Sequence, residues 1–110
     1  MEKLSLIKRV LEDRKASDIL VLDVSQLTNI ADFFIIATAS STIHARALAE
    51  HLREKLGEEG YTVDHVEGLE FGNWVLLDLM DTIVHICTPE WRERYGIEWI
   101  WAEARRVEVC

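Results

Sequence analysis

The chain has 110 residues and a formal net charge of −8, with 49% hydrophobic and 29% charged residues. We expect a single folded domain over residues 1–110, because this length supports one core and the composition is far from that of a disordered chain. An acidic chain has the wrong sign for binding phosphates. We therefore expect no direct DNA binding and at most a peripheral contact with RNA, while a basic protein is a favoured partner.

The sequence shows no sign of a membrane or secretory segment. No apolar stretch approaches the length of a membrane span, and residues 1–4 do not begin a signal peptide. Two cysteines, Cys87 and Cys110, are too few for a disulfide framework, so we expect reduced thiols. These observations predict a cytoplasmic protein without membrane contact.

The first elements follow from apolar spacing. Side chains with helical spacing predict an amphipathic first helix: Leu4, Ile7, Val10, Leu11 and Arg14. Residues 15–18 close this helix, and residues 19–24 are typical of a first strand. Residues 32–38 are apolar on both faces, which predicts a second, central strand.

A long helix is expected to follow. Ser40, Ser41 and Thr42 offer hydroxyls that cap a helix N-terminus. The buried stripe predicted for this helix consists of Ala45, Leu48, Ala49, Leu52 and Leu56. Gly57 and Gly60 are expected to supply the left-handed positions that end it, and residues 61–66 predict a third strand.

Residues 74–87 predict a β-hairpin with an acidic tip. Two apolar runs, residues 74–77 and 83–86, flank the turn at residues 78–81. Both runs are apolar on both faces, so we expect a hairpin covered on each side. A two-residue loop at 80–81, which we favour, places these side chains on one face: Trp74, Leu76, Asp78, Ile83 and His85. A three-residue loop would instead move His85 to the face of Val75 and Leu77.

The C-terminal part predicts short helices. Thr88, Pro89 and Glu90 are typical of a helix start, with the Thr88 hydroxyl as the cap, and Gly96 ends the helix. Residues 97–101 predict a further helical turn. The element order predicts an α/β fold with a mixed sheet of about five strands flanked by helices, including a right-handed parallel crossover from the second strand to the third.

Four carboxylates near predicted strand ends, Asp23, Asp32, Asp78 and Asp81, raise the hypothesis of a magnesium-dependent nucleotidyltransferase. The chain lacks the glycine-containing phosphate loop and the paired carboxylates on one strand that such an enzyme needs. The four histidines have no zinc-ligand spacing. We therefore expect no catalytic residues, no metal ligands and no cofactor.

Four tryptophans are many for a chain of this length: Trp74, Trp91, Trp99 and Trp101. Core packing accounts for part of this set. Tryptophans beside acidic groups are also typical of protein-binding hot spots. A further hypothesis is a homodimer of the free protein, joined through the aromatic C-terminal segment.

Four segments in order resemble the ribosomal silencing factor family, also called the Iojap-like family. Residues 15–24 look like its first strand motif, and residues 30–41 are similar to its most recognisable segment. Residues 67–68, 74–78 and 81–85 match its hairpin, and residues 95–101 resemble its C-terminal signature. Each string alone is weak, but four at the expected spacing are specific.

The resemblance implies a non-enzymatic translational repressor with a core related to nucleotidyltransferases. Such a protein binds the large ribosomal subunit through its basic ribosomal protein fourteen, keeps ribosomal RNA contact peripheral and blocks joining of the small subunit when nutrients are limiting. The matched hairpin positions nominate the partner-binding residues Trp74, Asp78, Leu79, Asp81 and His85. The chain departs from the family at Met80, where a glycine is usual. Because methionine tolerates positive φ poorly, we expect a turn of different shape there.

Overall fold

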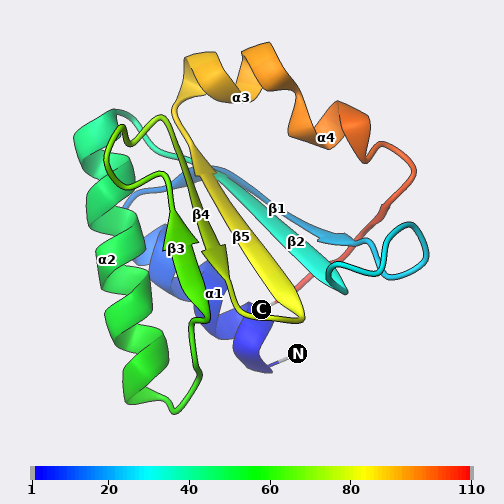
Figure 1. The fold of residues 1–110 in the computed structure, drawn as a ribbon, viewed down its shortest axis with the longest axis horizontal. Coiled ribbons are helices and arrows are strands. Elements are labelled where there is room, and N and C mark those ends of the chain that lie inside the picture. The colour runs from blue at the N-terminus through cyan, green and yellow to red at the C-terminus, as the bar shows by residue number, and fades with distance from the viewer. Residues whose placement is uncertain (1, 110) are drawn as a thin grey trace.

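The computed structural model describes residues 2–109 (Figure 1). Along this range the helices and strands are α1 (Glu2–Asp13), β1 (Ser17–Asp23), β2 (Phe33–Thr38), α2 (Thr42–Glu58), β3 (His65–Glu67), β4 (Trp74–Asp78), β5 (Thr82–Cys87), α3 (Pro89–Tyr95), α4 (Ile97–Ile100) and β6 (Arg105–Arg106). The α/β class and the mixed sheet predicted from the sequence are confirmed. None of the helices in residues 2–109 is long and apolar enough to cross a bilayer.

The sheet has the order β3-β4-β5-β2-β1-β6. β2 and β5 pair in parallel, and every other neighbouring pair is antiparallel. The sixth strand, β6, pairs with β1 through Arg106 and Arg105. This strand could not be predicted from the sequence, because two charged residues carry no apolar alternation. The central, parallel strands β2 and β5 are the most completely buried, as expected for parallel strands that are covered on both faces.

The third strand is shorter than predicted and lies at the edge of the sheet. It begins at His65, not at residue 61, and pairs only with β4 among the described strands. Tyr61 and Val63 still pack against the core from the connection that precedes it. β3 points in the same direction as β2, which confirms the parallel crossover, but β5 and β4 lie between them.

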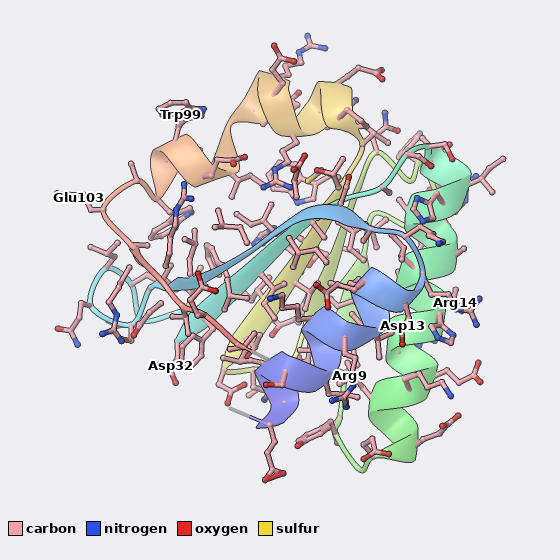
Figure 2. All side chains as sticks on the ribbon, turned by 180° about the vertical axis from the view of Figure 1, so that it is seen from behind. Arg9, Asp13, Arg14, Asp32, Trp99 and Glu103 are labelled. Carbon is pink, nitrogen blue, oxygen red and sulfur yellow. The ribbon has the colours of Figure 1, made fainter. Side chains whose placement is uncertain are left out.

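Helices α1 and α2 cover one face of the sheet, as both views show (Figures 1 and 2). The predicted α2 stripe is buried at all of its positions. Ser41 is the N-cap, and its hydroxyl accepts a hydrogen bond from the backbone N–H of His44 (3.1 Å). At the other end the prediction is half right, because Gly57 is still helical and Gly60 alone has the left-handed φ of +84°. α1 ends at Asp13, so Arg14 is exposed and not part of the buried stripe.

The opposite face is covered less completely. A second, smaller cluster packs there around Phe34, Ile36 and Ile97, beneath α4 and the C-terminal segment. β5 is buried over its whole length, whereas β4 alternates between buried and half-exposed side chains. The expectation that both hairpin strands are covered on both faces therefore holds for β5 and is wrong for β4.

Two details near the C-terminal helices differ from their predicted roles. Pro89 is at the first turn of α3 and Gly96 ends it with φ +54°, as predicted. The Thr88 hydroxyl, however, makes no capping bond and has no hydrogen-bond partner among the described residues. Cys87 is a free, buried thiol, and burial raises its pKa to about 12. Cys110 lies outside the described residues.

A buried arginine attaches α3 to the sheet. Arg92 is 9% exposed. Its Nη1 donates to the backbone carbonyl of Asp18 (2.6 Å) and to the hydroxyl of Thr38 (2.8 Å). Its Nε and Nη2 donate to the carboxylate of Glu98 (2.9 and 3.3 Å). The C-terminal helices are thus fixed to the irregular start of β1.

Candidate partner-binding site

The hairpin has the register favoured from the sequence. Leu76 pairs with His85 and Asp78 with Ile83, and the backbone N–H of Leu79 donates to the carbonyl of Thr82 (2.9 Å). The loop therefore consists of residues 80–81. Trp74, Leu76, Asp78, Ile83 and His85 share one face of the sheet, the face opposite α1 and α2.

Met80 adopts the backbone conformation that a glycine would favour. Its φ is +73°, and the backbone N–H of Asp81 donates to the carbonyl of Leu79 (2.9 Å) across it. Oδ1 of Asp78 accepts the backbone N–H of Met80 (2.8 Å), which supports the turn from the strand side. We expected methionine to avoid a positive φ here, and this expectation is wrong. The local hydrogen bonds hold Met80 in the left-handed region.

Trp74 and His85 form a hydrogen-bonded pair on this face. The Trp74 indole N–H donates to Nδ1 of His85 (3.1 Å). His85 is 6% exposed, and burial lowers its pKa to about 4. The imidazole is therefore neutral at pH 7 and works as a fixed acceptor beneath the half-exposed indole.

The pair belongs to a longer aromatic row. Phe34 packs edge-to-face on His85 and on Trp101, with centroid distances of 4.9 and 5.0 Å. Tyr95 lies between Trp74 and Trp91, at 5.9 and 4.9 Å. Three of the four tryptophans thus tie the hairpin to the C-terminal helices. Trp99 is the exception: it is 81% exposed and projects from α4 away from the sheet (Figure 2).

Two of the five nominated residues are not on the surface. Leu79 is 3% exposed and packs in the cluster beneath α1 and α2. His85 is buried as described above. Leu79 and His85 are therefore not exposed in the free chain, and their nomination as partner-binding residues stays a prediction. The sequence places His85 in an apolar run and Leu79 at the hairpin tip, but it does not show whether either side chain faces the core or the solvent.

The surface that contains Trp74 and Asp78 continues from β4 onto the neighbouring strand β3. His65 pairs with Asp78 and Glu67 with Leu76 across the β3–β4 ladder. Alternation along both strands places five exposed or half-exposed side chains on one surface, which we call the open sheet face: His65, Glu67, Trp74, Leu76 and Asp78. His65 and Glu67 could not be predicted as part of this surface, because residues 61–66 alone do not show which strand they pair with.

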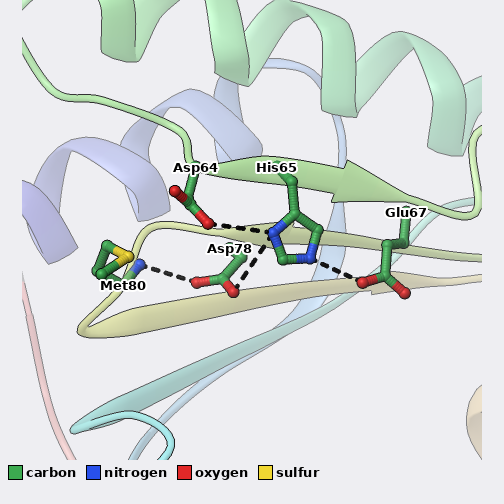
Figure 3. Close-up of polar contacts among 5 residues, drawn as sticks. All are labelled: Asp64, His65, Glu67, Asp78 and Met80. Atoms are coloured by element: carbon green, nitrogen blue, oxygen red, sulfur yellow. Dashed lines mark hydrogen bonds and ion pairs between the residues drawn. The ribbon is translucent and has the colours of Figure 1, made fainter.

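Acidic groups surround His65 on the open sheet face. Its Nε2 lies 2.7 Å from Oε2 of Glu67, and its Nδ1 lies 3.3 Å from Oδ2 of Asp64 and 3.6 Å from Oδ2 of Asp78 (Figure 3). The hydrogen bond to Glu67, followed by the one to Asp64, raises the pKa of His65.

The two tip carboxylates point to different sides of the sheet. Asp78 belongs to the open sheet face, whereas Asp81 forms an ion pair with Lys3 of α1 on the covered side. Partial burial raises the pKa of Asp81, but the hydrogen bond and charge of Lys3 lower it further, so the net direction is down. A partner that contacts both carboxylates must therefore wrap around the tip.

The four carboxylates considered for nucleotidyl transfer do not form one centre. Asp23 accepts from the hydroxyl and backbone N–H of Ser25 (2.6 and 3.0 Å), and these bonds lower its pKa. Asp32 is exposed (Figure 2). Within residues 2–109, Asp78 is the only one of the four in a group spaced to hold a metal ion, and its companions there are Asp64 and His65.

Comparison with known proteins identifies the family. A family model described as "Ribosomal silencing factor during starvation" matches residues 1–110. The "Ribosomal silencing factor RsfS" of Halalkalibacterium halodurans is 34% identical over 108 residues, which cover 98% of this chain and 92% of the relative. The protein of the same name from Chromobacterium violaceum is 43% identical over 91 residues, covering 83% and 75%.

A solved structure agrees with these matches. The crystal structure of a Chromobacterium violaceum protein superimposes with a TM-score of 0.89 at 40% identity, covering 92% of this chain and 84% of that one. The chain belongs to the ribosomal silencing factor family. Membership gives it a role in ribosome silencing and translation regulation.

Proposed function

We propose that this protein is a cytoplasmic translational repressor that binds the large ribosomal subunit through ribosomal protein fourteen. On this proposal the bound protein occupies the surface that the small subunit must meet, so subunit joining is blocked sterically. Translation then falls under nutrient limitation. The observation that carries the proposal is the open sheet face, where the half-exposed Trp74 shares one surface with the acidic side chains of Glu67 and Asp78.

Trp74 has the properties of an anchor residue. Its indole is only half buried in the free chain, while His85 and Tyr95 hold the ring in place from two sides. A rigid, partly exposed aromatic ring loses little entropy on binding, which is why tryptophans dominate interface hot spots. A shallow hollow beside it, lined by Glu67, Leu76 and Trp91 among others, offers room for a partner's side chain.

Charge favours a basic partner for the same surface. Three carboxylates, those of Asp64, Glu67 and Asp78, surround His65, and the whole chain carries −8. Complementary charge mainly raises the association rate and the specificity of a contact. Asp81, on the other side of the tip, would add a second acidic contact to a partner that wraps around the hairpin.

We also propose that the protein acts without catalysis. Asp23, Asp78 and Asp81 are each engaged by a protein group, and they lie on different sides of the sheet. A nucleotidyltransferase needs its carboxylates converged on magnesium. Incubation with labelled nucleotides and magnesium tests this alternative, and nucleotide transfer by the wild-type protein would establish it.

The binding proposal is tested by co-sedimentation with isolated large subunits. Wild-type protein should sediment with them. Trp74→Ala should weaken the interaction about thirtyfold, as expected for a hot-spot aromatic worth about 2 kcal/mol. Asp78→Lys and Asp81→Lys should also weaken it and reduce its dependence on salt. Wild-type protein that stays in the supernatant would overturn the proposal.

A matched control separates the contact from net charge. Asp13→Lys makes the same charge change at an exposed position of α1, on the covered side of the sheet (Figure 2). This variant should bind like wild type. Adding small subunits and resolving the mixture on a sucrose gradient then measures joining, which wild type and Asp13→Lys should block and Trp74→Ala should not.

A further inference from the structure

An imidazole and two carboxylates converge where β3 meets the end of β4. Nδ1 of His65 and one carboxylate oxygen each from Asp64 and Asp78 all lie within 4.8 Å of one another (Figure 3). Asp64 and His65 are adjacent in the chain, while Asp78 comes from the neighbouring strand. The cluster is therefore a product of the β3–β4 register, and neither strand alone contains it.

Separate contacts hold each member in place. The backbone N–H of Asp64 donates to the carbonyl of Asp78 (2.7 Å), which fixes the two backbones together. The backbone N–H of Met80 binds Oδ1 of Asp78 and leaves Oδ2 directed at His65. Glu67 binds Nε2 of His65 and so orients the ring with Nδ1 toward the two aspartates.

These positions suit a transition-metal ion. A tetrahedral ion with bonds of about 2.0–2.1 Å separates its ligand atoms by about 3.4 Å. The Nδ1 atom of His65 lies 3.3 and 3.6 Å from the two aspartate oxygens. A carboxylate on the far nitrogen of a metal-binding histidine is the usual second partner of such a ring, and Glu67 occupies that position.

We propose that His65, Asp64 and Asp78 bind one divalent transition-metal ion of the zinc class, with Glu67 as the positioning residue. An imidazole with two carboxylates favours zinc and its neighbours over calcium or magnesium, which prefer oxygen ligands alone. Three protein ligands leave a position for water or for a further donor. Ligand spacing along the chain does not reveal this site, because Asp78 joins Asp64 and His65 only through strand pairing.

The alternative is an ion-pair cluster without metal affinity. A proton on Nδ1 of His65 would donate to the aspartates and satisfy the same geometry. Metal and proton would compete for this nitrogen. Only a direct measurement of zinc binding distinguishes a metal site from an ion-pair cluster. This measurement needs only the free protein, so it does not rest on the proposed ribosomal function.

Isothermal titration of the untagged, full-length protein with zinc chloride provides the test. Each protein should carry Cys110→Ser, since a terminal thiol is itself a zinc ligand. One equivalent of zinc should bind this reference protein. Glu67→Gln should weaken binding about 10- to 100-fold, as for other carboxylates that bind the far nitrogen of a metal-ligating histidine. His65→Gln and Asp64→Asn remove ligands and should weaken it at least as much.

His51→Gln is the matched control, because His51 lies on α2 outside the cluster, and it should leave zinc binding unchanged. Zinc should also shift the NMR resonances of the His65 ring before those of His44 or His51. Absence of saturable binding, or equal binding by His65→Gln and the reference protein, would overturn the proposal and leave the ion-pair cluster. Circular dichroism of each variant establishes that it is folded.

Discussion

Trp74 donates its indole N–H to Nδ1 of His85, and this bond determines the state of the histidine. An indole nitrogen can only donate, so Nδ1 must be unprotonated and the ring proton must sit on Nε2. Nε2 is buried, and no partner accepts from it among the described residues. The imidazole thus holds the half-exposed Trp74 ring and leaves one buried donor unsatisfied, which costs about 1–3 kcal/mol.

The His85 pair predicts a pH-dependent stability. Above pH 6.5 the ring is neutral in both folded and unfolded chains. Burial lowers the folded pKa from 6.5 to about 4, so between these values only the unfolded chain takes up the proton and stability falls as pH falls. The total loss from this group is about 3 kcal/mol.

Urea unfolding of wild type and His85→Gln at pH 7 and pH 4 measures this effect. Glutamine keeps an acceptor for Trp74 but does not titrate, and all other groups are common to both proteins. The stability advantage of wild type should shrink by about 3 kcal/mol on going to pH 4. If the difference in free energy of unfolding between wild type and His85→Gln is the same at pH 7 and pH 4, burial does not lower the pKa of His85.

Arg92 should be critical for stability. Arg92→Met removes the donors to Asp18, Thr38 and Glu98 and leaves Glu98 without its partner. We expect a loss of about 3 kcal/mol in the free energy of unfolding. Arg92→Lys should recover little of it, because one ammonium cannot replace the planar fork. Glu98→Gln keeps one neutral acceptor for Arg92 and should cost less than Arg92→Met in the same denaturation experiment.

Two glycines with nearly the same positive φ should respond differently to alanine. Gly60 and Gly68 have φ of +84° and +85°. A Cβ at Gly60 meets nothing within 4 Å, whereas one at Gly68 lies 2.1 Å from the backbone oxygen of Trp74. Gly60→Ala should cost about 1 kcal/mol from the left-handed conformation alone.

Gly68→Ala should cost about 1–3 kcal/mol more, because the β3–β4 connection must move away from Trp74. Thermal melting compares the two variants, and large-subunit binding provides a second readout for Gly68→Ala. Equal melting temperatures would show that the connection yields without cost.

Met80→Gly should stabilise the protein. Methionine at φ +73° is strained by about 1–2 kcal/mol, and glycine removes this strain at the expense of some chain entropy. We expect a net gain of about 0.5–1 kcal/mol. Met80→Ala removes the same exposed side chain but keeps the strain, so its free energy of unfolding should stay near wild type. A gain shared by both variants would assign the effect to the side chain instead.

The homodimer hypothesis now has a defined surface. Trp99 and Ile100 are 81% and 71% exposed, whereas Trp101 packs on Phe34. If the free chain pairs through this segment, light scattering should give the mass of a dimer for wild type and of a monomer for Trp99→Ser, with unchanged melting. A wild-type monomer at high concentration would remove the hypothesis.

Local patterns in the sequence were sufficient for much of the fold. The α2 stripe, the Ser41 cap and the hairpin with its two-residue loop all follow from spacing and residue type, because they depend on neighbours along the chain. The family could likewise be recognised from short strings in order. Sequence patterns could not predict where β1 and β3 end or that β6 exists, since these features depend on pairing with a remote strand.

Tertiary structure alone decided how the site is assembled. Leu79 and His85 are buried, Asp81 forms an ion pair with Lys3, and His65 lies next to Asp78 of the neighbouring strand. The physical reason is that alternation reports which residues share a face but not what covers that face. Helices α1 and α2 and the aromatic row cover most of the two faces, and they leave Trp74 half-exposed and the side chains of the β3–β4 edge accessible.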